Sequence, residues 1–318
     1  MRTVGPDEID RLLPFDHLVD VLRDAFRKGA VQPVRHHHTL ERAHGASPTL
    51  LLMPAWNDFT KADAGYAGVK IVTVAPDNGE KNLPAVMGVY LLLDGTTGAP
   101  LALIDGQRLT LRRTAAASAL AATYLAREDA SKLLVIGAGA LAPFLGRAHA
   151  GVRPIREIRI WNRTAANAEK VAETLRAEGL DATVTTDLEA ALGWADIVSS
   201  ATISPTPLVE GARLKPGAHL DLVGAFTPAL RESDDEAVRR ASVFVDVRES
   251  AVREAGDIVQ ALESGALGRD AIKADLFGLA RGEHPGRESA AEITLFKSVG
   301  AAIEDLAAGI AVFEAISR

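Results

Sequence analysis

The sequence predicts an α/β protein whose larger part is a Rossmann-type, doubly wound parallel sheet. From Lys132 onward, short apolar strands alternate with helical segments, a pattern typical of parallel sheets covered by helices on both faces. The first of these strands runs directly into a glycine-rich turn and then a helix, as a dinucleotide-binding unit requires. Before Lys132, several strands follow one another closely, which favours a smaller antiparallel sheet.

The first third of the chain is predicted to mix helix and strand. Apolar residues recur at helical spacing over 15–28, at Leu18, Val21, Leu22 and Phe26, which predicts an amphipathic helix. Strand-like runs follow at 49–54, 66–74 and 85–94, and GTTGAP leads into a further strand, LALID. The Ala- and Leu-rich segment 109–126 then predicts a long helix.

The remainder predicts the parallel sheet and a closing helix. Six short apolar runs, LLVIG, EIRIWN, ATVTT, DIVSSA, HLDLVG and SVFVDV, are expected to be strands, with helices over segments such as 165–179 and 232–241. Residues 266–292 contain few apolar side chains and are predicted to be rich in loops. The last segment predicts a helix with one apolar stripe, made of Ile303, Leu306, Ile310 and Phe313.

Composition excludes several classes of function. The 318 residues suggest about two domains, and a net charge of −7 without a long basic run gives no reason to expect nucleic acid as a partner. The absence of cysteine excludes disulfides, thiolate catalysis and cysteine-ligated metals. Acidic residues near the N-terminus and the lack of a long apolar stretch lead us to expect a cytoplasmic protein with no membrane partner.

The glycine-rich turn in LLVIGAGALA carries the clearest chemical signal. In Gly137-x-Gly139-x-x-Ala142, the first glycine allows the tight turn and the second lets the backbone approach a pyrophosphate, while the alanine permits close packing of helix and strand. The start of the helix then faces the phosphates. Ala140, inside the turn, is expected to contact the cofactor as well. The alternative is a tight strand–helix turn without a ligand.

The end of the next strand predicts the type of cofactor. NAD-binding domains usually place an acid there to hold the ribose 2′-hydroxyl, whereas this chain has Asn162, Arg163 and Thr164. An arginine can pair with a 2′-phosphate, and the two polar neighbours can hydrogen-bond to it. We therefore expect NADPH, with NADH binding at lower affinity. The alternative is a solvated arginine at a strand end.

Several stretches, distributed over nearly the whole chain, carry a family resemblance. They are GVKIVTV (68–74), LRRTAAASALAATYLA (111–126), the glycine-rich turn, ADIVSSAT (195–202) and ITLFKSVGAAIEDLAA (293–308). Together they resemble the ornithine cyclodeaminase/mu-crystallin family. The resemblance implies a Rossmann domain over 126–294, inserted into an α+β substrate-binding and dimerisation domain made of 1–125 and 295–318. It also implies a homodimer formed through the sheet of that smaller domain.

The resemblance implies a substrate site as well. Family members hold a substrate carboxylate with a lysine on a strand and an arginine at the start of the long helix, which correspond to Lys70 and Arg113 here. Arg35 is the less securely placed third member. A forked guanidinium and an ammonium orient a carboxylate strongly. An inward lysine is costly unless paired, so Lys70 either lines a site or reaches outward to solvent. Arg112, next to Arg113, is expected to be solvated.

The resemblance also completes the expected cofactor site and names a catalytic residue. Further cofactor contacts are expected from Arg113, which is placed to approach the phosphates, and from residues in later segments, namely Ala201, Thr202, Val223 and Ser298. Lys70 is the expected catalytic residue, with the proton coming from it, from water or with the substrate.

One difference from the cyclodeaminases of this family reduces the number of expected reactions. Cyclodeaminases of this family carry an aspartate shortly after a Val-Gly dipeptide, where this chain reads Val223-Gly224-Ala225-Phe226. An apolar ring cannot transfer protons to amines as ring closure requires, whereas reduction of a closed ring needs orientation and a hydride. Phe226 is expected to pack on the ring of the substrate, or else to fill the core.

The expected reaction is reduction of Δ1-pyrroline-2-carboxylate to L-proline, and also of Δ1-piperideine-2-carboxylate to L-pipecolate. The alternatives are an ornithine cyclodeaminase or an alanine dehydrogenase, and, in another class, a nucleotide-regulated ligand-binding protein like the crystallin of this family. No metal is expected. The run His36-His37-His38 alternates between the two faces of a strand, so the three side chains cannot converge on one ion. Asp234 and Asp235 are expected to begin a helix.

Overall fold

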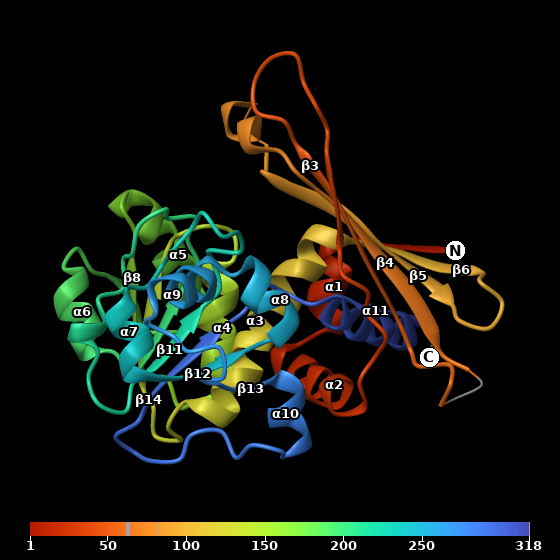
Figure 1. Ribbon diagram of the computed structural model, residues 1–318. Coiled ribbons are helices and arrows are strands. Elements are labelled where there is room, and N and C mark those ends of the chain that lie inside the picture. Colours follow the sequence, from red (N-terminus) through yellow and green to blue (C-terminus); the bar gives the residue numbers. More distant parts are fainter. Residues whose placement is uncertain (62–63, 82, 318) are drawn as a thin grey trace. The chain divides into compact units, whose positions relative to one another are not determined.

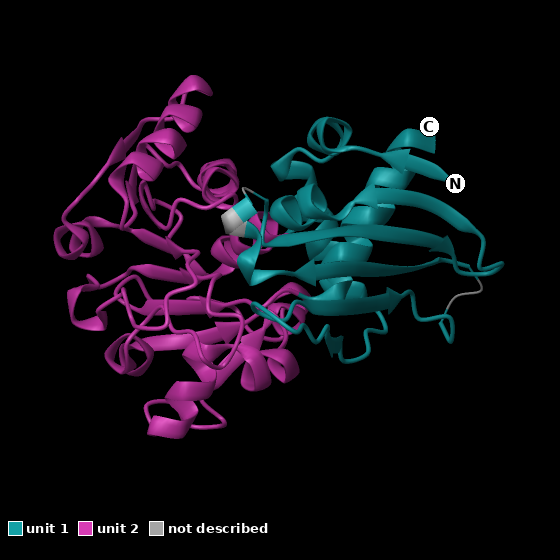
Figure 2. Ribbon diagram, turned by 90° about the horizontal axis from the view of Figure 1, so that it is seen from above, with its two compact units in different colours: residues 1–113, 301–318 teal, residues 114–300 magenta. Residues whose placement is uncertain are grey.

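The computed structural model describes residues 1–61, 64–81 and 83–317 and consists of two compact units (Figure 2). Unit 1 comprises Met1–Arg113 and Ala301–Arg318, and unit 2 comprises Thr114–Gly300. The first division falls inside helix α3 (Gly106–Leu125), rather than after residue 125. The second falls after residue 300, so the whole of strand β14 (Ile293–Lys297) belongs to unit 2.

Unit 1 contains a six-stranded sheet, and its antiparallel part confirms the prediction for the first third of the chain. The strand order is β1-β6-β5-β4-β3-β2. The strands are β1 (Arg2–Val4), β2 (His36–Thr39), β3 (Thr49–Trp56), β4 (Tyr66–Val74), β5 (Val86–Asp94) and β6 (Pro100–Asp105). All neighbours are antiparallel except β1, which pairs parallel with β6. The long strands β3 to β6 are visible beside the helices of this unit in Figure 1.

Helices cover one face of this sheet. They are α1 (Pro6–Leu12), α2 (Phe15–Lys28) and α11 (Ala302–Ser317), and a short 3-10 helix, η1 (Pro76–Lys81), follows β4. The bounds of α2 are those predicted, and its apolar stripe is buried. Helix α11 contacts β3, β4 and β5 as well as α2. Strand β4 alternates accordingly, with Lys70 and Val72 buried and Ile71 36% exposed. On β5, Met87 and Val89 are 44% and 37% exposed, so apolar side chains also lie on the outer face.

Unit 2 contains a parallel sheet of eight strands and confirms the predicted fold class. The order is β13-β12-β14-β11-β10-β7-β8-β9, with every neighbouring pair parallel. The strands besides β14 are β7 (Lys132–Ile136), β8 (Glu157–Trp161), β9 (Ala182–Val184), β10 (Ile197–Ser200), β11 (His219–Leu222), β12 (Ala241–Val245) and β13 (Ile272–Asp275). Strands β7 to β11 follow the Rossmann pattern, in which the first strand lies centrally and the order reverses beside it.

Both faces of the unit 2 sheet are buried, as a doubly wound fold requires. Along β7, Leu133 and Val135 belong to one apolar core, and Leu134 and Ile136 to the other. The covering helices are α4 (Ala142–Val152), α5 (Ala165–Ala177), α6 (Leu188–Trp194), α7 (Asp235–Arg240), α8 (Arg248–Glu254), α9 (Gly256–Ser264) and α10 (Leu276–Arg281), with the 3-10 helix η2 (Gly211–Arg213). Among the described residues, no helix is both long enough and apolar enough to cross a bilayer.

One local prediction was incomplete and another was wrong. Residues 266–292 are rich in loops, as predicted, but they also contain β13 and α10. Strand β13 lies at the edge of the sheet and α10 is short, so neither needs the continuous apolar pattern that marks a central element. The helix expected over 232–241 begins only at Asp235, because the backbone before it pairs with another segment. The N–H groups of Leu208 and Val209 donate to the oxygen of Glu232, and the N–H of Asp234 donates to the oxygen of Val209.

Candidate active site

Lys70 lies on the buried face of β4 and is paired with an acid. Its side chain is 2% exposed. Its Nζ lies 3.0 Å from Oδ1 and 2.8 Å from Oδ2 of Asp305, in the first turn of α11. The lysine therefore does not reach outward to solvent. A buried ammonium is tolerated when a carboxylate compensates its charge, and Asp305, which is fully buried, supplies that compensation.

Arg113 on α3 joins the same ion-pair cluster. Its Nε lies 3.0 Å from Oδ1 of Asp305, the oxygen that Lys70 also contacts, and its Nη1 lies 2.6 Å from Oε2 of Glu304. Both acids are fully buried and Arg113 is 5% exposed. Nη2 makes no hydrogen bond within the described part of the chain, so this nitrogen keeps a donor for a ligand. The structure thus brings the two predicted carboxylate-binding residues to a single carboxyl oxygen.

Burial and the neighbouring charges shift the pKa values of Lys70, Asp305 and Arg113. Burial, together with the positive charge of Arg113, lowers the pKa of Lys70 to about 8, although Asp305 opposes this shift. Burial alone would raise the pKa of Asp305, but the charges of Arg113 and Lys70 keep it below its ordinary value. Burial works against the charge on Arg113, but Asp305 and Glu304 outweigh it and raise its pKa. Lys70 can therefore release a proton near neutral pH while Asp305 remains ionised.

Arg35 contributes to the same electrostatic environment. It is partly buried in the segment before β2, and its positive charge also lowers the pKa of Lys70. The three predicted substrate-binding residues of unit 1 therefore influence one another, with Lys70 and Arg113 sharing an acid and Arg35 acting through its charge.

Sequence analysis missed three residues of this cluster. Glu304 and Asp305 stand side by side among apolar residues in the first half of α11, which was the available signal for buried partners of the two cations. Tyr90 pairs with Lys70 across β4 and β5. It is 1% exposed, and its hydroxyl has no hydrogen-bond partner among the residues that the structure describes. Burial and the charge of Asp305 raise the pKa of Tyr90 well above its ordinary value.

Glycines make room for the tyrosine ring. A Cβ at Gly68 would lie 2.1 Å from the hydroxyl of Tyr90, and a Cβ at Gly309 would lie 2.5 Å from its Cε1. The ring is therefore held tightly between β4 and α11, beside the ion-pair cluster.

Arg112 is not solvated, contrary to the prediction. It is 7% exposed. Its Nε donates to the backbone oxygen of Leu13 at 2.8 Å, its Nη1 donates to Asp10 at 2.9 Å, and the guanidinium lies 4.7 Å from the ring centroid of Phe15. The second turn of α3 is thus anchored to α1, to the start of α2 and to the loop between them, which spacing along α3 alone does not indicate.

The predicted dinucleotide turn in unit 2 has the required geometry. Gly137 adopts φ +105°, where other residues are strained, and a Cβ there would lie 2.7 Å from the oxygen of Ala201. A Cβ at Gly139 would meet nothing within 4 Å, so the space beside this backbone is open. Helix α4 begins at Ala142, which is 1% exposed, and Ala140 lies exposed in the turn. These residues fit a pyrophosphate at the helix start.

The other predicted cofactor positions of unit 2 come directly after the carboxyl ends of strands. Backbone N–H groups connect them to neighbouring strand ends, from Ala201 to Ile136, from Val223 to Ser200 and from Ser298 to Leu222. Thr202 differs from the prediction in detail. Its N–H and its hydroxyl both donate to Oε1 of Glu232, at 2.7 and 2.9 Å. Its polar groups are therefore engaged within the protein.

The residues after β8 are open to solvent and carry an unpaired cation. Arg163 and Thr164 are exposed, and Arg163 makes no ion pair or hydrogen bond with the described residues. Asn162 donates from Nδ2 to the oxygen of Thr164 at 2.9 Å. The hydroxyl of Thr164 does not cap α5. This strand end therefore presents an arginine and a hydroxyl where an NAD site would present an acid.

Phe226 does not fill the core. It is 39% exposed and follows Ala225, whose φ of +38° is the one left-handed value among the described non-glycine residues. Such strained backbone persists only where its surroundings enforce it, and it is common at functional sites. The exposed ring is thus available to a ligand. Packing against the ring of the substrate therefore remains the predicted role of Phe226.

The histidine run lies on β2, where all three side chains are exposed. Within residues 1–61, 64–81 and 83–317, no group of three or more His, Cys, Asp or Glu side chains could hold a metal ion. Asp234 caps α7 by accepting from the N–H of Ala237 at 2.8 Å.

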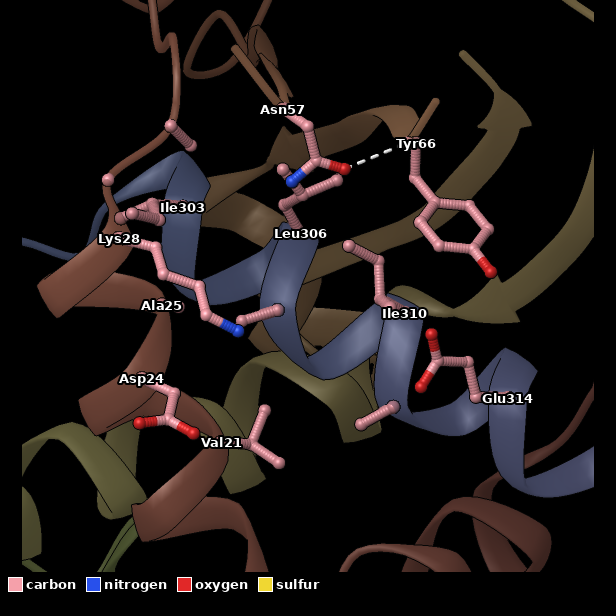
Figure 3. A pocket seen from close by; sticks show the side chains of 15 residues that line it. Val21, Asp24, Ala25, Lys28, Asn57, Tyr66, Ile303, Leu306, Ile310 and Glu314 are labelled. Carbon is pink, nitrogen blue, oxygen red and sulfur yellow. Dashed lines mark hydrogen bonds between the residues drawn. The ribbon is translucent and has the colours of Figure 1, made fainter. Parts of the chain in front are cut away.

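A pocket of about 400 Å³ lies in unit 1 between α2 and α11 (Figure 3). Its apolar floor includes Ile303, Leu306 and Ile310, and its polar rim includes Lys28 and Glu314. It contains none of the predicted site residues. Its charged side chains are exposed, so the ion-pair cluster remains the stronger candidate for chemistry.

The chain is similar to proteins of known family over nearly its whole length. The model of the ornithine cyclodeaminase/mu-crystallin family matches residues 6–318. Protein SAR DEFICIENT 4 of Arabidopsis thaliana is 44% identical over 280 residues, which are 86% of this chain and 84% of that protein. A Delta(1)-pyrroline-2-carboxylate reductase of Paracoccus denitrificans is 38% identical over 287 residues, 88% of this chain and 89% of that enzyme.

This chain is also similar in structure to a solved member of the same group of enzymes as the Paracoccus relative. The Delta(1)-pyrroline-2-carboxylate reductase of Thermococcus litoralis, in complex with NADH and L-proline, superposes with a TM-score of 0.93 at 33% identity. The alignment covers 100% of this chain and 98% of that one.

Proposed function

This chain belongs to the ornithine cyclodeaminase/mu-crystallin family, and we propose that it reduces Δ1-pyrroline-2-carboxylate to L-proline with NADPH. It is an oxidoreductase that uses a nicotinamide cofactor and acts on imino acids. We include Δ1-piperideine-2-carboxylate, which gives L-pipecolate, as a second substrate. The observation that carries the proposal is the convergence of Lys70 and Arg113 on one buried carboxyl oxygen.

The cluster is suited to bind a carboxylate. Three cations, Lys70, Arg113 and Arg35, act on a region that contains two buried acids, Glu304 and Asp305. The acids orient the two buried cations, and Nη2 of Arg113 is left to donate to the substrate. A charge-assisted contact of this kind fixes both the position and the face of a small planar imine.

Lys70 is the proposed proton donor. An imine carbon is most electrophilic when its nitrogen is protonated, and bound NADPH supplies the hydride that the carbon accepts. The pKa of about 8 for Lys70 lies near the operating pH, where a general acid is most effective. Asp305 holds the ammonium in place, and burial excludes water from it.

Phe226 supports reduction over ring closure. An exposed aromatic ring offers an apolar surface to the methylene groups of a cyclic substrate, and it cannot exchange protons with the amines of ornithine. We therefore propose that the chain acts on rings that are already closed.

Arg163 supports NADPH over NADH. Its guanidinium is exposed and unpaired among the described residues, at the strand end where the adenosine ribose binds in Rossmann domains. The Thermococcus relative was solved with NADH, so both cofactors belong in the binding test.

We further propose a cytoplasmic homodimer, formed through the outer face of the unit 1 sheet. Ile71, Met87 and Val89 on β4 and β5 are each at least 36% exposed, and a second copy would remove these apolar side chains from water.

The test is a side-by-side assay of the purified protein with four substrate sets. These are the five-membered and six-membered cyclic imino acids, ornithine, and pyruvate with ammonia, each with NADPH and with NADH. We expect oxidation of NADPH with the cyclic imino acids. Turnover only of ornithine or of pyruvate would replace the proposed substrate, and cofactor binding without any turnover would favour a ligand-binding protein.

A further inference from the structure

A second buried ionic cluster lies in unit 2, and the function proposed above does not use it. Glu232, Asp257 and Lys297 are each fully buried. Nζ of Lys297 lies 3.3 Å from Oδ2 of Asp257 and 3.8 Å from Oε2 of Glu232. Neither of those two carboxyl oxygens has a hydrogen-bond partner within the described part of the chain. The two unbonded oxygens therefore face one ammonium group.

The other oxygen of each acid is fully engaged. Oε1 of Glu232 accepts from the hydroxyl of Ser200 at 2.7 Å and from the N–H and hydroxyl of Thr202. Oδ1 of Asp257 accepts from the N–H of Glu232 at 2.9 Å and from Ser233. An additional proton in the cluster would therefore reside on an unbonded oxygen, without breaking these hydrogen bonds.

The cluster contains two acids and one base, so it carries one excess negative charge when both acids are ionised. An unpaired charge in the interior is unfavourable, and protonation of one acid removes it. Burial, reinforced by the charge of Asp257 and opposed by Lys297, raises the pKa of Glu232 to about 7. The charged groups that face Glu232 among the described residues are Asp257 on α9 and Lys297 on β14.

The cluster also connects strand ends that bear predicted cofactor-binding residues. Glu232 binds Thr202 after β10, and Lys297 donates to the oxygen of Gly224 after β11. A Cβ at Gly224 would lie 2.6 Å from Oε1 of Glu232, so the backbone of this turn packs closely against the carboxylate of Glu232. The glycine-rich turn and Arg163 assign the adenosine half to the ends of β7 and β8. The second half of a Rossmann domain then receives the nicotinamide.

We propose that Glu232 is a positioning residue whose ionisation, set by Asp257 and Lys297, makes the site prefer the oxidised cofactor over the reduced one. The inference rests on the nicotinamide cofactor of the proposed function and not on its substrate. The oxidised nicotinamide ring carries a positive charge and the reduced ring carries none. A negative cluster at these strand ends would attract the former, whereas a protonated, neutral cluster would not discriminate between them.

The sign of the pH dependence follows from this difference. Below the pKa of Glu232 the cluster is neutral, and NADP⁺ gains nothing from it. Above that pKa, Glu232 has released its proton to solvent, and NADP⁺ binds more tightly while NADPH changes little. Both cofactor forms carry the same 2′-phosphate, so its own titration cancels in the ratio of their dissociation constants.

The experiment measures the Kd of NADP⁺ and of NADPH by calorimetry from about pH 6 to about pH 8.5. We expect the ratio of Kd for NADP⁺ to Kd for NADPH to fall about fivefold or more over this range. In Glu232→Gln, which can still accept the hydrogen bonds from Ser200 and Thr202, the ratio should stay at its acidic value. Asp257→Asn leaves one acid beside Lys297, so the inflection should move to lower pH.

A second readout does not depend on the cofactor. Infrared difference spectra of the ligand-free protein should show a protonated carboxyl band that disappears as the pH rises through about 7 and is absent from Glu232→Gln. A Kd ratio that changes equally in the wild type and in Glu232→Gln would overturn the inference, as would a ratio that does not change. Normal cofactor binding with a constant ratio refutes only this inference, whereas failure to bind either cofactor refutes the proposed function as well.

Discussion

Replacing Arg113 tests the proposed carboxylate-binding cluster most directly. In Arg113→Ala, the substrate loses a charge-assisted contact, and we expect a loss in kcat/KM that corresponds to about 2–5 kcal/mol. At about 1.4 kcal/mol for each factor of ten, this is roughly 30-fold to several thousand-fold. Arg113→Lys keeps the charge but loses the forked geometry, so it should recover only part of the activity.

The structure adds a consequence for stability. Arg113 contacts two fully buried acids, Glu304 and Asp305. Its removal leaves Lys70 as the remaining buried cation beside them, which should cost about 3–5 kcal/mol of folding free energy. Thermal unfolding must therefore be measured for each variant, and kinetics recorded well below the unfolding transition.

Arg112→Lys is the matched control. The two arginines are adjacent, but Arg112 donates to Leu13 and Asp10, whereas Arg113 donates to Glu304 and Asp305. We expect the control to lose some stability and to keep its kcat/KM. The assay is steady-state oxidation of NADPH with Δ1-pyrroline-2-carboxylate, together with fluorescence titration of NADPH, which should change less. Near-normal kinetics for both Arg113→Ala and Lys70→Ala would refute the reasoning.

Four further predictions concern the pH dependence set by Lys70, the choice of cofactor, the choice of substrate and the oligomeric state. Because the pKa of Lys70 is about 8 instead of 10.5, the proton donor is lost as pH rises through about 8, and the rate should fall there. In Lys70→Arg a lower rate should be independent of pH in that range. The same shift means that stability rises as pH increases between those two values, since the buried lysine is easier to discharge in the folded state. Arg163→Ala should weaken NADPH binding by about 1.5–3 kcal/mol and leave NADH nearly unchanged; tighter NADH binding in the wild type would contradict this. Ornithine should release no ammonia with either cofactor, and robust release would show that Phe226 does not limit the chemistry. Light scattering at micromolar concentration should give a dimer, and Ile71→Glu should give a monomer; a monomeric wild type would count against the proposed interface.

The local features of both units could be predicted from the sequence. Helix α2, the long strands β4 and β5, and the order strand, glycine-rich turn, helix at β7 and α4 were all visible in patterns spanning fewer than about 20 residues. Such patterns are local. The spacing of apolar residues within one element decides which of its faces is buried, and the tight turn at Gly137 depends on the glycine at that position. The fold class followed from these features, whereas the family was identified by the resemblance of longer stretches, and both were confirmed.

The partners of the charged residues could not be predicted in this way. The sequence placed Lys70 and Arg113 in a candidate site, but only the tertiary structure brought Asp305 to both of them, 235 and 192 positions away. Likewise, Arg112 was read as solvated because its partners lie on another element. Strand β13 and helix α10 escaped notice because they are short and peripheral.

The two ionic clusters show the physical reason for this division. The apolar pattern of a helix or strand indicates which face is buried, but a buried charge is stabilised by whichever opposite charge the fold brings within a few ångströms. The sequence by itself therefore indicated most of the elements, the glycine-rich turn and the two cations of unit 1. Only the tertiary structure decided that Asp305 compensates both cations, and that Glu232, Asp257 and Lys297 enclose one unbalanced charge at the strand ends of unit 2.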